Sequence, residues 1–190
     1  MIQPTLLRDW EGSDVAGWYM SEKLDGWRML WDGENFISRQ GKIFDAPEWF
    51  KNGMPNKVLD GELFLGRGMF NGIQAAMSGG WSGLEFRIFD APEIKGDYKK
   101  RLRSYRLGKK PAHIRLVGHT LCEGIEHMME YAAEIVTNGG EGVVLRNPRA
   151  IYKAGRTSDV LRWVPQDPAL NRQRLSLGSA STKCTATVPV

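Results

Sequence analysis

The chain has 190 residues, 42% of them apolar, which suffices for one globular domain with an ordinary core, or for one domain and a tail. A formal net charge of +4 makes it mildly basic, which is compatible with a polyanionic partner without establishing one. Two cysteines argue against a disulfide framework and favour a reducing compartment, and no apolar run near the start indicates a signal peptide or a membrane span.

Short strands joined by turns are predicted over most of the chain. Asp25-Gly26 and Asp32-Gly33 are dipeptides that typically close hairpins, so two consecutive hairpins are expected around them. The glycine-rich section 66–83 is expected to be a loop-rich insert, because it lacks the spacing of a phosphate-binding loop. The expected strands are 18–22, 27–31, 35–39, 58–65, 84–90, 142–146 and 159–164.

One amphipathic helix is predicted in the second half of the chain. Apolar residues recur every three or four positions from about Glu123 to Thr137, and Asn138-Gly139-Gly140 ends the pattern. After Pro165 no sustained periodicity remains. We therefore expect one domain over residues 1–165 and a poorly ordered tail or a truncated continuation over residues 166–190.

The strongest chemical signal is the hexapeptide Lys23-Leu24-Asp25-Gly26-Trp27-Arg28, which places an amine and a guanidinium around one bend. A deprotonated lysine can attack phosphorus and hold a phosphoryl group as a phosphoramide. The carboxylates of Glu62 and Glu141, together with a polyphosphate, suit Mg²⁺, whose charge would favour the free amine of the lysine. Phe89 offers a ring for a nucleobase to stack on. Together these residues suit nucleotidyl transfer, in which lysine attacks an α-phosphate and pyrophosphate leaves.

Five motifs follow one another in a fixed order, and the segment Lys153-Ala154-Gly155-Arg156 comes after them. The motifs are Lys23 to Arg28 (Lys-x-Asp-Gly-x-Arg), Ser38-Arg39-Gln40-Gly41, Asp60-Gly61-Glu62, Phe86 to Asp90, and Glu141 to Arg146. This order resembles the adenylylation domain of ATP-dependent DNA ligases, within the covalent nucleotidyltransferase superfamily that also holds RNA ligases and mRNA capping enzymes. The resemblance spans roughly residues 21–165 and is most similar to the small bacterial and phage ligases.

The resemblance implies an α+β, ATP-grasp-like covalent nucleotidyltransferase fold with antiparallel sheets and flanking helices, with ATP in the groove between them and no complete OB-fold. It implies that Lys23 becomes adenylylated, that Glu141 and Glu62 act at the metal, Mg²⁺ or Mn²⁺, and that Glu62 also holds the ribose. The other contacts that it implies are Glu22 to adenine, chiefly through its backbone, Phe89 stacked on adenine, Arg28 and Arg39 at the sugar and phosphate or at the nick, and Arg156 and Arg162 at the phosphates.

The sequence departs from this family in two places. The last family motif is usually Lys-x-Lys, whereas here Arg162 replaces one lysine and the uncharged Val164 replaces the other. Guanidinium and ammonium are not interchangeable, so Arg162 preserves the charge alone. In the family these lysines orient the ATP phosphates, so the loss of one at Val164 argues against efficient self-adenylylation. The second departure is length, because residues 166–190 are too few for the five-stranded OB-fold that normally follows. We expect a fragment, a divergent stand-alone domain, or a protein whose OB-fold clamp comes from a partner.

Each motif residue also has a plainer interpretation that the residues alone leave open. A charged side chain at a turn or a strand end is often solvated, and an aromatic residue that ends an alternating strand is often part of the core. These interpretations are a turn lysine for Lys23, an edge-strand carboxylate for Glu62, a strand-leading charge for Glu141, a core ring for Phe89, and solvated hairpin charges for Arg28 and Arg39.

A basic stretch runs from Lys95 to Lys110, with Asp97 as its one acid. Such runs are often solvated surfaces, but a ligase has to bind the phosphate backbone of duplex DNA. The candidate DNA contacts are Lys99, Lys100, Arg101 and Arg103. The three histidines and two cysteines lack metal-ligand spacing, which argues against a zinc site.

The preferred hypothesis is an ATP-dependent DNA ligase that seals nicked duplex DNA through a lysyl-AMP intermediate. We expect it to act as a monomer in the cytoplasm, which would be the host cytoplasm for a phage protein, and with no membrane contact. One alternative is an RNA ligase or a capping-type nucleotidyltransferase. The other is a catalytically impaired DNA-binding module, for which Val164 is the motivating residue.

Overall fold

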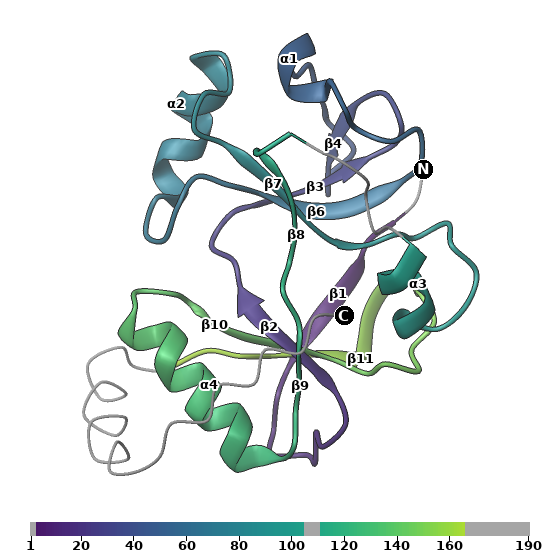
Figure 1. Ribbon diagram of the computed structural model, residues 1–190, viewed down its shortest axis with the longest axis vertical. Helices are drawn as coiled ribbons and strands as arrows, with labels where there is room; N and C mark the ends of the chain where they lie inside the picture. Colours follow the sequence, from purple (N-terminus) through teal and green to yellow (C-terminus); the bar gives the residue numbers. More distant parts are fainter. Residues whose placement is uncertain (1–2, 105–110, 166–190) are drawn as a thin grey trace.

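The computed structural model describes residues 3–104 and 111–165, and it forms a mixed α+β fold built on two β-sheets. In Figure 1 one sheet lies above the other, with helices at the top, at the lower left and at the right-hand side. Sheet A is the lower one and has the strand order β1-β11-β10-β2-β9. Sheet B is the upper one, with the order β5-β4-β3-β6-β7-β8.

The elements have the following bounds. Sheet A contains β1 (Thr5–Asp9), β2 (Tyr19–Lys23), β9 (Thr120–Leu121), β10 (Gly142–Arg146) and β11 (Gly155–Trp163). Sheet B contains β3 (Trp27–Trp31), β4 (Phe36–Ser38), β5 (Ile43–Phe44), β6 (Leu59–Phe64), β7 (Glu85–Asp90) and β8 (Ile114–Leu116). The helices are α1 (Glu48–Lys51), α2 (Ile73–Ser78), α3 (Tyr98–Ser104) and α4 (Ile125–Thr137), with a 3₁₀ turn η1 (Phe70–Gly72) before α2.

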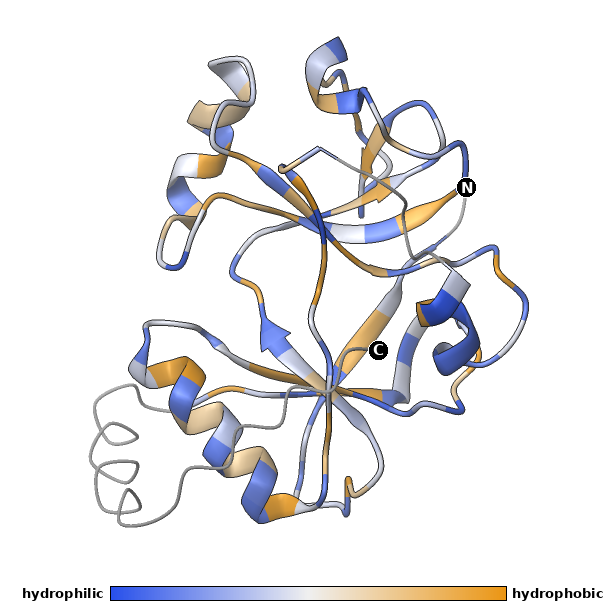
Figure 2. Cartoon of the chain, viewed as in Figure 1, coloured by the Kyte–Doolittle hydropathy of each residue, from blue (hydrophilic) through white to orange (hydrophobic). Residues whose placement is uncertain are grey.

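Each sheet has its own hydrophobic core on its outer face. The core of sheet B includes the fully buried Phe36, Phe50 and Phe86, with Phe50 supplied by α1. Sheet A packs against the apolar face of α4 through Val143 and Leu145. Figure 2 shows apolar residues along the central strands and on α4. Because side chains alternate along a strand, the residues between these core positions face the space between the two sheets.

The expectation of purely antiparallel sheets is wrong at two strand pairs. β1 pairs with β11 in parallel, and β7 pairs with β8 in parallel. The second pair is joined by a connection that contains α3, as a parallel crossover requires. The first pair joins strands from the two ends of the described chain. Both sheets are therefore mixed.

The first expected hairpin is also absent. Asp25-Gly26 connects β2 of sheet A to β3 of sheet B, so this turn carries the chain from one sheet to the other. An ideal Cβ on Gly26 would collide with the carbonyl oxygen of Leu63 and with Cγ of Glu62, so the glycine allows a close approach to β6. The second hairpin, β3 to β4 through Asp32-Gly33, is confirmed.

The expected strands and the expected helix are present, several of them with shifted ends. The strands at 27–31 and 142–146 have the expected bounds, whereas the last strand begins earlier, at Gly155. The section 66–83 is not entirely loop, because it contains η1 and α2. The expected tail, 166–190, lies outside the described residues. Within the described ranges, no helix has both the length and the apolar character needed to cross a membrane.

Candidate active site

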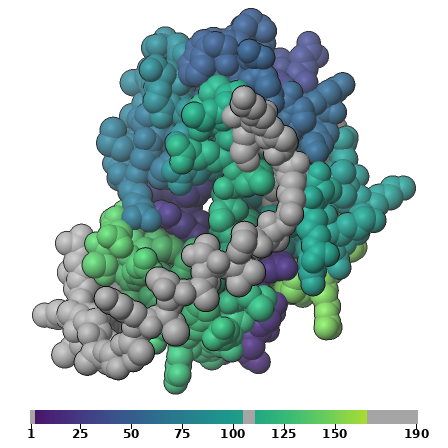
Figure 3. Space-filling view, in the orientation of Figure 1, coloured from purple at the N-terminus to yellow at the C-terminus, as the bar shows by residue number. Residues whose placement is uncertain are grey.

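A cavity of about 760 Å³, here called the central cleft, lies between the two sheets. Sheet A contributes Ser21, Lys23 and Val144, and sheet B contributes Glu62 and Phe89. Figure 3 shows the surface hollowed between the upper and the lower part of the molecule. Small-molecule and cofactor sites commonly measure roughly 300 to 1,000 Å³. The central cleft is therefore large enough for a nucleotide.

Lys23 is the last residue of β2 and lines the central cleft. Its Nζ lies 2.5 Å from Oε1 of Glu141, and the two side chains are 17% and 35% exposed. Strand pairing explains this contact, because Gly142, the residue after Glu141, is the direct partner of Lys23 across β10 and β2. An ideal Cβ on Gly142 would collide with the carbonyl oxygen of Trp163, so this position requires glycine.

Glu62 faces Lys23 from the other sheet, where it pairs with Arg28 across β6 and β3. Burial raises the pKa of Glu62 to about 8, although the charges of Arg28 and Lys23 lower it. The charges of Asp60 and Glu141 act in the same direction as burial. Glu62 is therefore substantially protonated near neutral pH.

Arg28 ties the two sheets together at the edge of the central cleft. Its Nε and Nη2 donate to the two carboxylate oxygens of Asp60 at 2.9 and 2.6 Å, and its Nη1 donates to the carbonyl oxygen of Thr5 at 2.6 Å. The hydroxyl of Tyr152 donates to Asp60 as well, at 2.7 Å. Burial alone would lower the pKa of Arg28, but Asp60 raises it above its ordinary value. The network holds a permanently charged guanidinium beside the cleft.

Phe89 lies in β7, 8% exposed, and lines the central cleft. The guanidinium carbons of Arg28 and Arg146 lie 5.2 and 4.8 Å from the centre of its ring. Such cation–π contacts are favourable, most of all when they are shielded from water. A base that approaches this ring therefore meets two guanidinium groups.

Arg146 lines the central cleft and is 8% exposed. Its Nη1 donates to the hydroxyl of Ser21 at 3.1 Å, and its guanidinium lies 5.8 Å from the ring of Tyr98. None of the ion pairs among the described residues involves Arg146. Nearby, burial lowers the pKa of His119 to about 3, with a further contribution from the charge of Arg146, so this imidazole is neutral at pH 7.

Of the other residues expected to contact the nucleotide, two line the central cleft and two do not. Arg39 is exposed at the rim of the central cleft, in the turn between β4 and β5. Glu22 lines the cleft but directs its carboxylate to Arg67. The structure does not bring Arg156 and Arg162 to the cleft. Arg156 donates to the carbonyl oxygen of Leu7 at 3.0 Å, and Arg162 donates to Asp9 at 2.7 Å.

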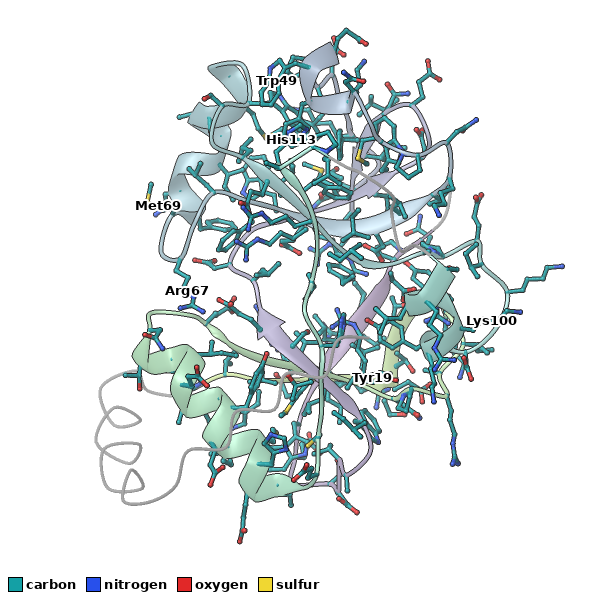
Figure 4. The ribbon with its side chains drawn as sticks, viewed as in Figure 1. Tyr19, Trp49, Arg67, Met69, Lys100 and His113 are labelled. Atoms are coloured by element: carbon teal, nitrogen blue, oxygen red, sulfur yellow. The ribbon has the colours of Figure 1, made fainter. Side chains whose placement is uncertain are left out.

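The basic residues expected to contact DNA separate into two groups on α3. Lys99, Lys100 and Arg103 are exposed, and Figure 4 shows Lys100 directed into solvent. Arg101 is 2% exposed and forms an ion pair with Asp90 at 2.7 Å. The prediction that Arg101 contacts DNA is therefore corrected, because its guanidinium is enclosed in the protein.

The carboxylates beside Lys23 fit the chemistry of a divalent cation that also binds phosphate. Mg²⁺ commonly takes one or two carboxylates, with substrate phosphates and water filling the other positions. Glu141 and Glu62 supply two such carboxylates close to Lys23. Over residues 3–104 and 111–165, no cluster of three or more acidic, histidine or cysteine side chains could hold a metal ion. A cation here would depend on the phosphates of a bound nucleotide.

Three residues of the site were missed by the sequence reasoning. Asp60 belongs to the Asp-Gly-Glu motif and Arg146 ends the Glu-Gly motif, so both carried a signal. Tyr152 carried none, because its contact with Asp60 depends on how the two sheets meet.

Comparisons with known proteins show what the domain is similar to. No protein-family model matches the chain. A DNA ligase of Haemophilus influenzae is 33% identical over 164 residues, which make up 83% of this chain and 61% of that protein. A solved structure of the Lig E DNA ligases aligns with a TM-score of 0.78 at 26% identity and covers 87% of this chain and 69% of that chain. Chlorella virus DNA ligase-adenylate shares the fold, with a TM-score of 0.69 at 19% identity over 86% and 69% of the two chains.

Two sheets that enclose a cleft, with a lysine at the end of a strand inside it, define a nucleotidyltransferase domain of the kind found in DNA ligases. The chain is similar to DNA ligases both in sequence and in fold. This confirms the resemblance seen in the ordered motifs. The chain spans 61% of the length of the Haemophilus influenzae relative.

Proposed function

We propose that the protein is an ATP-dependent DNA ligase that charges Lys23 with AMP and seals nicked duplex DNA. The observation that carries the proposal is Lys23 Nζ in the central cleft, 2.5 Å from the carboxylate of Glu141. The relationship to DNA ligases supports the reaction, and the size of the cleft supports a nucleotide as its ligand. We place the nucleotidyltransferase domain at residues 1–165, with residues 166–190 as a tail or the start of a continuation.

In the first step, Lys23 attacks the α-phosphorus of ATP. Its ammonium donates to Glu141, so the carboxylate is within reach to take the proton that the amine has to lose. The Nζ–P bond forms as the P–O bond to pyrophosphate breaks, which leaves AMP on the lysine as a phosphoramide. Glu141 thus both holds the lysine in place and receives its proton.

The remaining cleft residues bind the nucleotide. The base lies against Phe89 and the backbone of Glu22, and Glu62 holds the ribose. Arg28 stands beside the sugar and the α-phosphate, and Arg39 reaches the phosphates from the rim. Arg162 pairs with Val144 on the strand face that lines the cleft, so a change of rotamer away from Asp9 brings it toward the phosphates. Arg156 makes the outermost contact, after release from Leu7.

A divalent cation, Mg²⁺ or Mn²⁺, would be held by Glu141 and Glu62 together with the phosphates. Bound there, it would neutralise charge on the phosphates and favour the free amine of Lys23. Because burial raises the pKa of Glu62 to about 8, this carboxyl has to lose its proton before it can serve as a ligand. Proton loss from Glu62 is thereby coupled to cation binding.

The second and third steps act on DNA. AMP passes from Lys23 to the 5′-phosphate of a nick, and the 3′-hydroxyl then attacks that phosphate and releases AMP. Lys99, Lys100 and Arg103 give α3 an exposed cationic surface that can follow a phosphate backbone. The protein acts as a monomer on the duplex, and an OB-fold from a partner or from a longer chain would complete the clamp.

The deciding experiment is incubation of the protein with α-labelled ATP and Mg²⁺, followed by denaturing electrophoresis. We expect a label that survives denaturation in the wild type and is absent in Lys23→Ala. Labelled GTP in a parallel reaction tests a capping-type enzyme, and nicked RNA offered beside nicked DNA tests an RNA ligase.

A folded wild-type protein that takes no label would overturn self-charging. Val164 gives a specific reason why self-charging could fail. It lies next to Gly142, where it replaces the lysine that the related enzymes usually have beside the nucleophile. Sealing of a nick that is already adenylylated would then separate an enzyme that lacks the first step from a DNA-binding module.

A further inference from the structure

Arg67 connects the loop after β6 to sheet A. Its Nε and Nη2 donate to the two carboxylate oxygens of Glu22 at 2.8 and 3.0 Å, and its Nη1 donates to the carbonyl oxygen of Asn138 at 2.9 Å. Figure 4 shows Arg67 reaching from the upper part of the molecule toward α4. These three hydrogen bonds of the guanidinium are all made across the gap between the sheets.

The two acceptors of Arg67 are well suited to it. Arginine and a carboxylate form a two-point contact that fixes their relative orientation, which lysine cannot reproduce. Asn138 is the C-terminal cap of α4, where the last carbonyl groups lack helical partners and attract a cation. One side chain thereby fixes three elements, which are the loop after β6, the end of β2 and the end of α4.

The end of β2 needs such a contact. β2 pairs with β10 as far as Lys23, but its pairing with β9 covers Tyr19 and Met20. Among the described residues, Glu22 and Lys23 therefore pair with β10 on one side of β2 and with no strand on the other side. Glu22 faces the α4 side of the sheet, since it pairs with Val143 of the α4 core, whereas the adjacent Lys23 faces the cleft.

We infer that Arg67 is a positioning residue for the nucleotidyl-transfer step, which holds Lys23 in its attacking position by fixing Glu22. The inference rests on the proposed function, in which Lys23 is the nucleophile. Arg67 lies outside the central cleft and so does not bind the nucleotide itself. Its ion pair is partly exposed, with the two side chains 37% and 19% accessible, so its contribution to stability is small. Its effect is on the geometry of the nucleophile, where small displacements have large consequences for rate.

The test compares Arg67→Ala with Arg67→Lys and with a matched control, Arg115→Ala. Arg115 also lies in the part of the chain that forms sheet B, and it forms a partly exposed ion pair with Glu85 at 3.0 Å. Two rates are measured for each protein, lysyl-AMP formation at saturating ATP and sealing of a nick that already carries AMP. The second reaction does not use the amine of Lys23.

We expect Arg67→Ala to slow lysyl-AMP formation by about tenfold or more, a size that misplacement of a reacting group readily produces. Sealing of the pre-adenylylated nick should change by less than about twofold, and so should both rates of Arg115→Ala. Arg67→Lys should behave like Arg67→Ala, because one ammonium cannot make the two-point contact. The exchanged pair Glu22→Arg with Arg67→Glu should recover part of the rate. Equal losses in both reactions, or an unchanged rate of lysyl-AMP formation, would overturn the inference.

A second measurement does not require the wild type to form lysyl-AMP. It therefore tests the role of Arg67 separately, because a wild type without lysyl-AMP would contradict the proposed function and not the positioning of Lys23 by Arg67. An amine-acylating reagent is applied, and modification of Lys23 and of the exposed Lys100 is followed by mass spectrometry. If Arg67 holds Lys23 against Glu141, Arg67→Ala should raise the rate at Lys23 at least about threefold and leave Lys100 unchanged. Equal rates at Lys23 in the two proteins would show that Arg67 does not position this lysine.

Discussion

Nζ of Lys23 and Oε1 of Glu141 lie 2.5 Å apart although 118 positions separate them in the chain. The contact follows from the pairing of β2 with β10, which sets Lys23 opposite Gly142. Neither side chain is fully buried, so the pair remains accessible to a ligand in the central cleft. The resting ion pair therefore has to open or transfer a proton before the lysine can act.

Replacement of Glu141 tests this requirement. Glu141→Gln retains a hydrogen-bond acceptor for Lys23 but loses the negative charge that holds the ammonium and can take its proton. We expect lysyl-AMP formation to slow by about a hundredfold, the order of loss seen when one preorganised electrostatic group is removed from an active site. Single-turnover labelling with α-labelled ATP measures the effect. A rate within about threefold of the wild type would remove Glu141 from the chemical step.

The raised pKa of Glu62 predicts a pH dependence of stability. Between its ordinary value of 4.5 and about 8, the folded protein holds a proton on Glu62 that the unfolded chain has lost. The free energy of unfolding should therefore fall as the pH rises through this window, and the contribution of Glu62 should level off above it. Glu62→Gln, which mimics the neutral acid, should lack this part of the decline.

Urea unfolding of both proteins at about pH 5 and about pH 8.5 measures the difference. Contributions from other groups are shared by the two proteins, so the comparison isolates Glu62. Parallel losses of stability in wild type and Glu62→Gln would show that this carboxyl titrates at an ordinary pH.

Val164 offers a gain-of-function test. Its Cα and Cγ1 lie 3.1 Å from an ideal Cβ on Gly142, the residue that pairs with Lys23. A lysine at position 164 would add a cation close to Lys23 and, in the proposed reaction, to the phosphates of ATP. We expect Val164→Lys to speed lysyl-AMP formation by about tenfold, equivalent to about 1.4 kcal/mol of transition-state stabilisation. Val164→Met is the control of similar length without charge, and equal rates for the two variants would contradict the prediction.

Tyr152 should contribute to stability through Asp60. Its hydroxyl donates to a fully buried carboxylate at 2.7 Å, and hydrogen bonds to charged groups contribute about 1.5 to 3 kcal/mol. Tyr152→Phe removes that donor and retains the ring. Urea unfolding at pH 7 should show a loss of this size. A change below about 0.5 kcal/mol would mean that water replaces the hydroxyl without cost.

The exposed lysines of α3 predict salt-dependent DNA binding. Each phosphate contact that is lost should reduce the slope of log affinity against log salt by about 0.9. Lys99→Gln with Lys100→Gln should therefore weaken binding to nicked duplex DNA and reduce the slope by about 1.8. Lys51→Gln is the control, since Lys51 lies on α1 and pairs with Glu48 at 2.7 Å. An unchanged slope would place the DNA elsewhere on the surface.

The parts of the fold that were predictable are those with local pairing. Alternating residues and an Asp-Gly turn located β3 and β4, because a strand and its hairpin partner lie close in sequence. The parallel pair of β1 and β11 was not predictable, since its strands lie about 150 residues apart and neither carries a turn signal toward the other. The prediction that Asp25-Gly26 closes a hairpin was wrong for a related reason. A dipeptide that permits a tight bend does not determine whether the next strand joins the same sheet.

The site was predictable where chemistry lies in short motifs and was not predictable where it depends on burial. Lys23, Glu62 and Glu141 carry motif signals, and the structure brings them together. Arg101 was assigned by charge alone, yet the buried stripe of α3 consists of Tyr98, Arg101 and Leu102, at helical spacing. The apolar members of that stripe predict which side of α3 faces inward, and Arg101 falls on that side.

The pairing of β1 with β11 bears on the order in which the protein can assemble during synthesis. Sheet B is built from residues 27–116, so its strands can pair once that stretch has left the ribosome. Sheet A holds Lys23, the proposed nucleophile, on β2, yet two of its three central strands, β10 and β11, are the last of the described strands to be translated. Non-local pairings of this kind form late and slowly. A nascent chain thus carries Lys23 long before it has Glu141 or a closed cleft, which delays any charging with nucleotide until translation has passed β11.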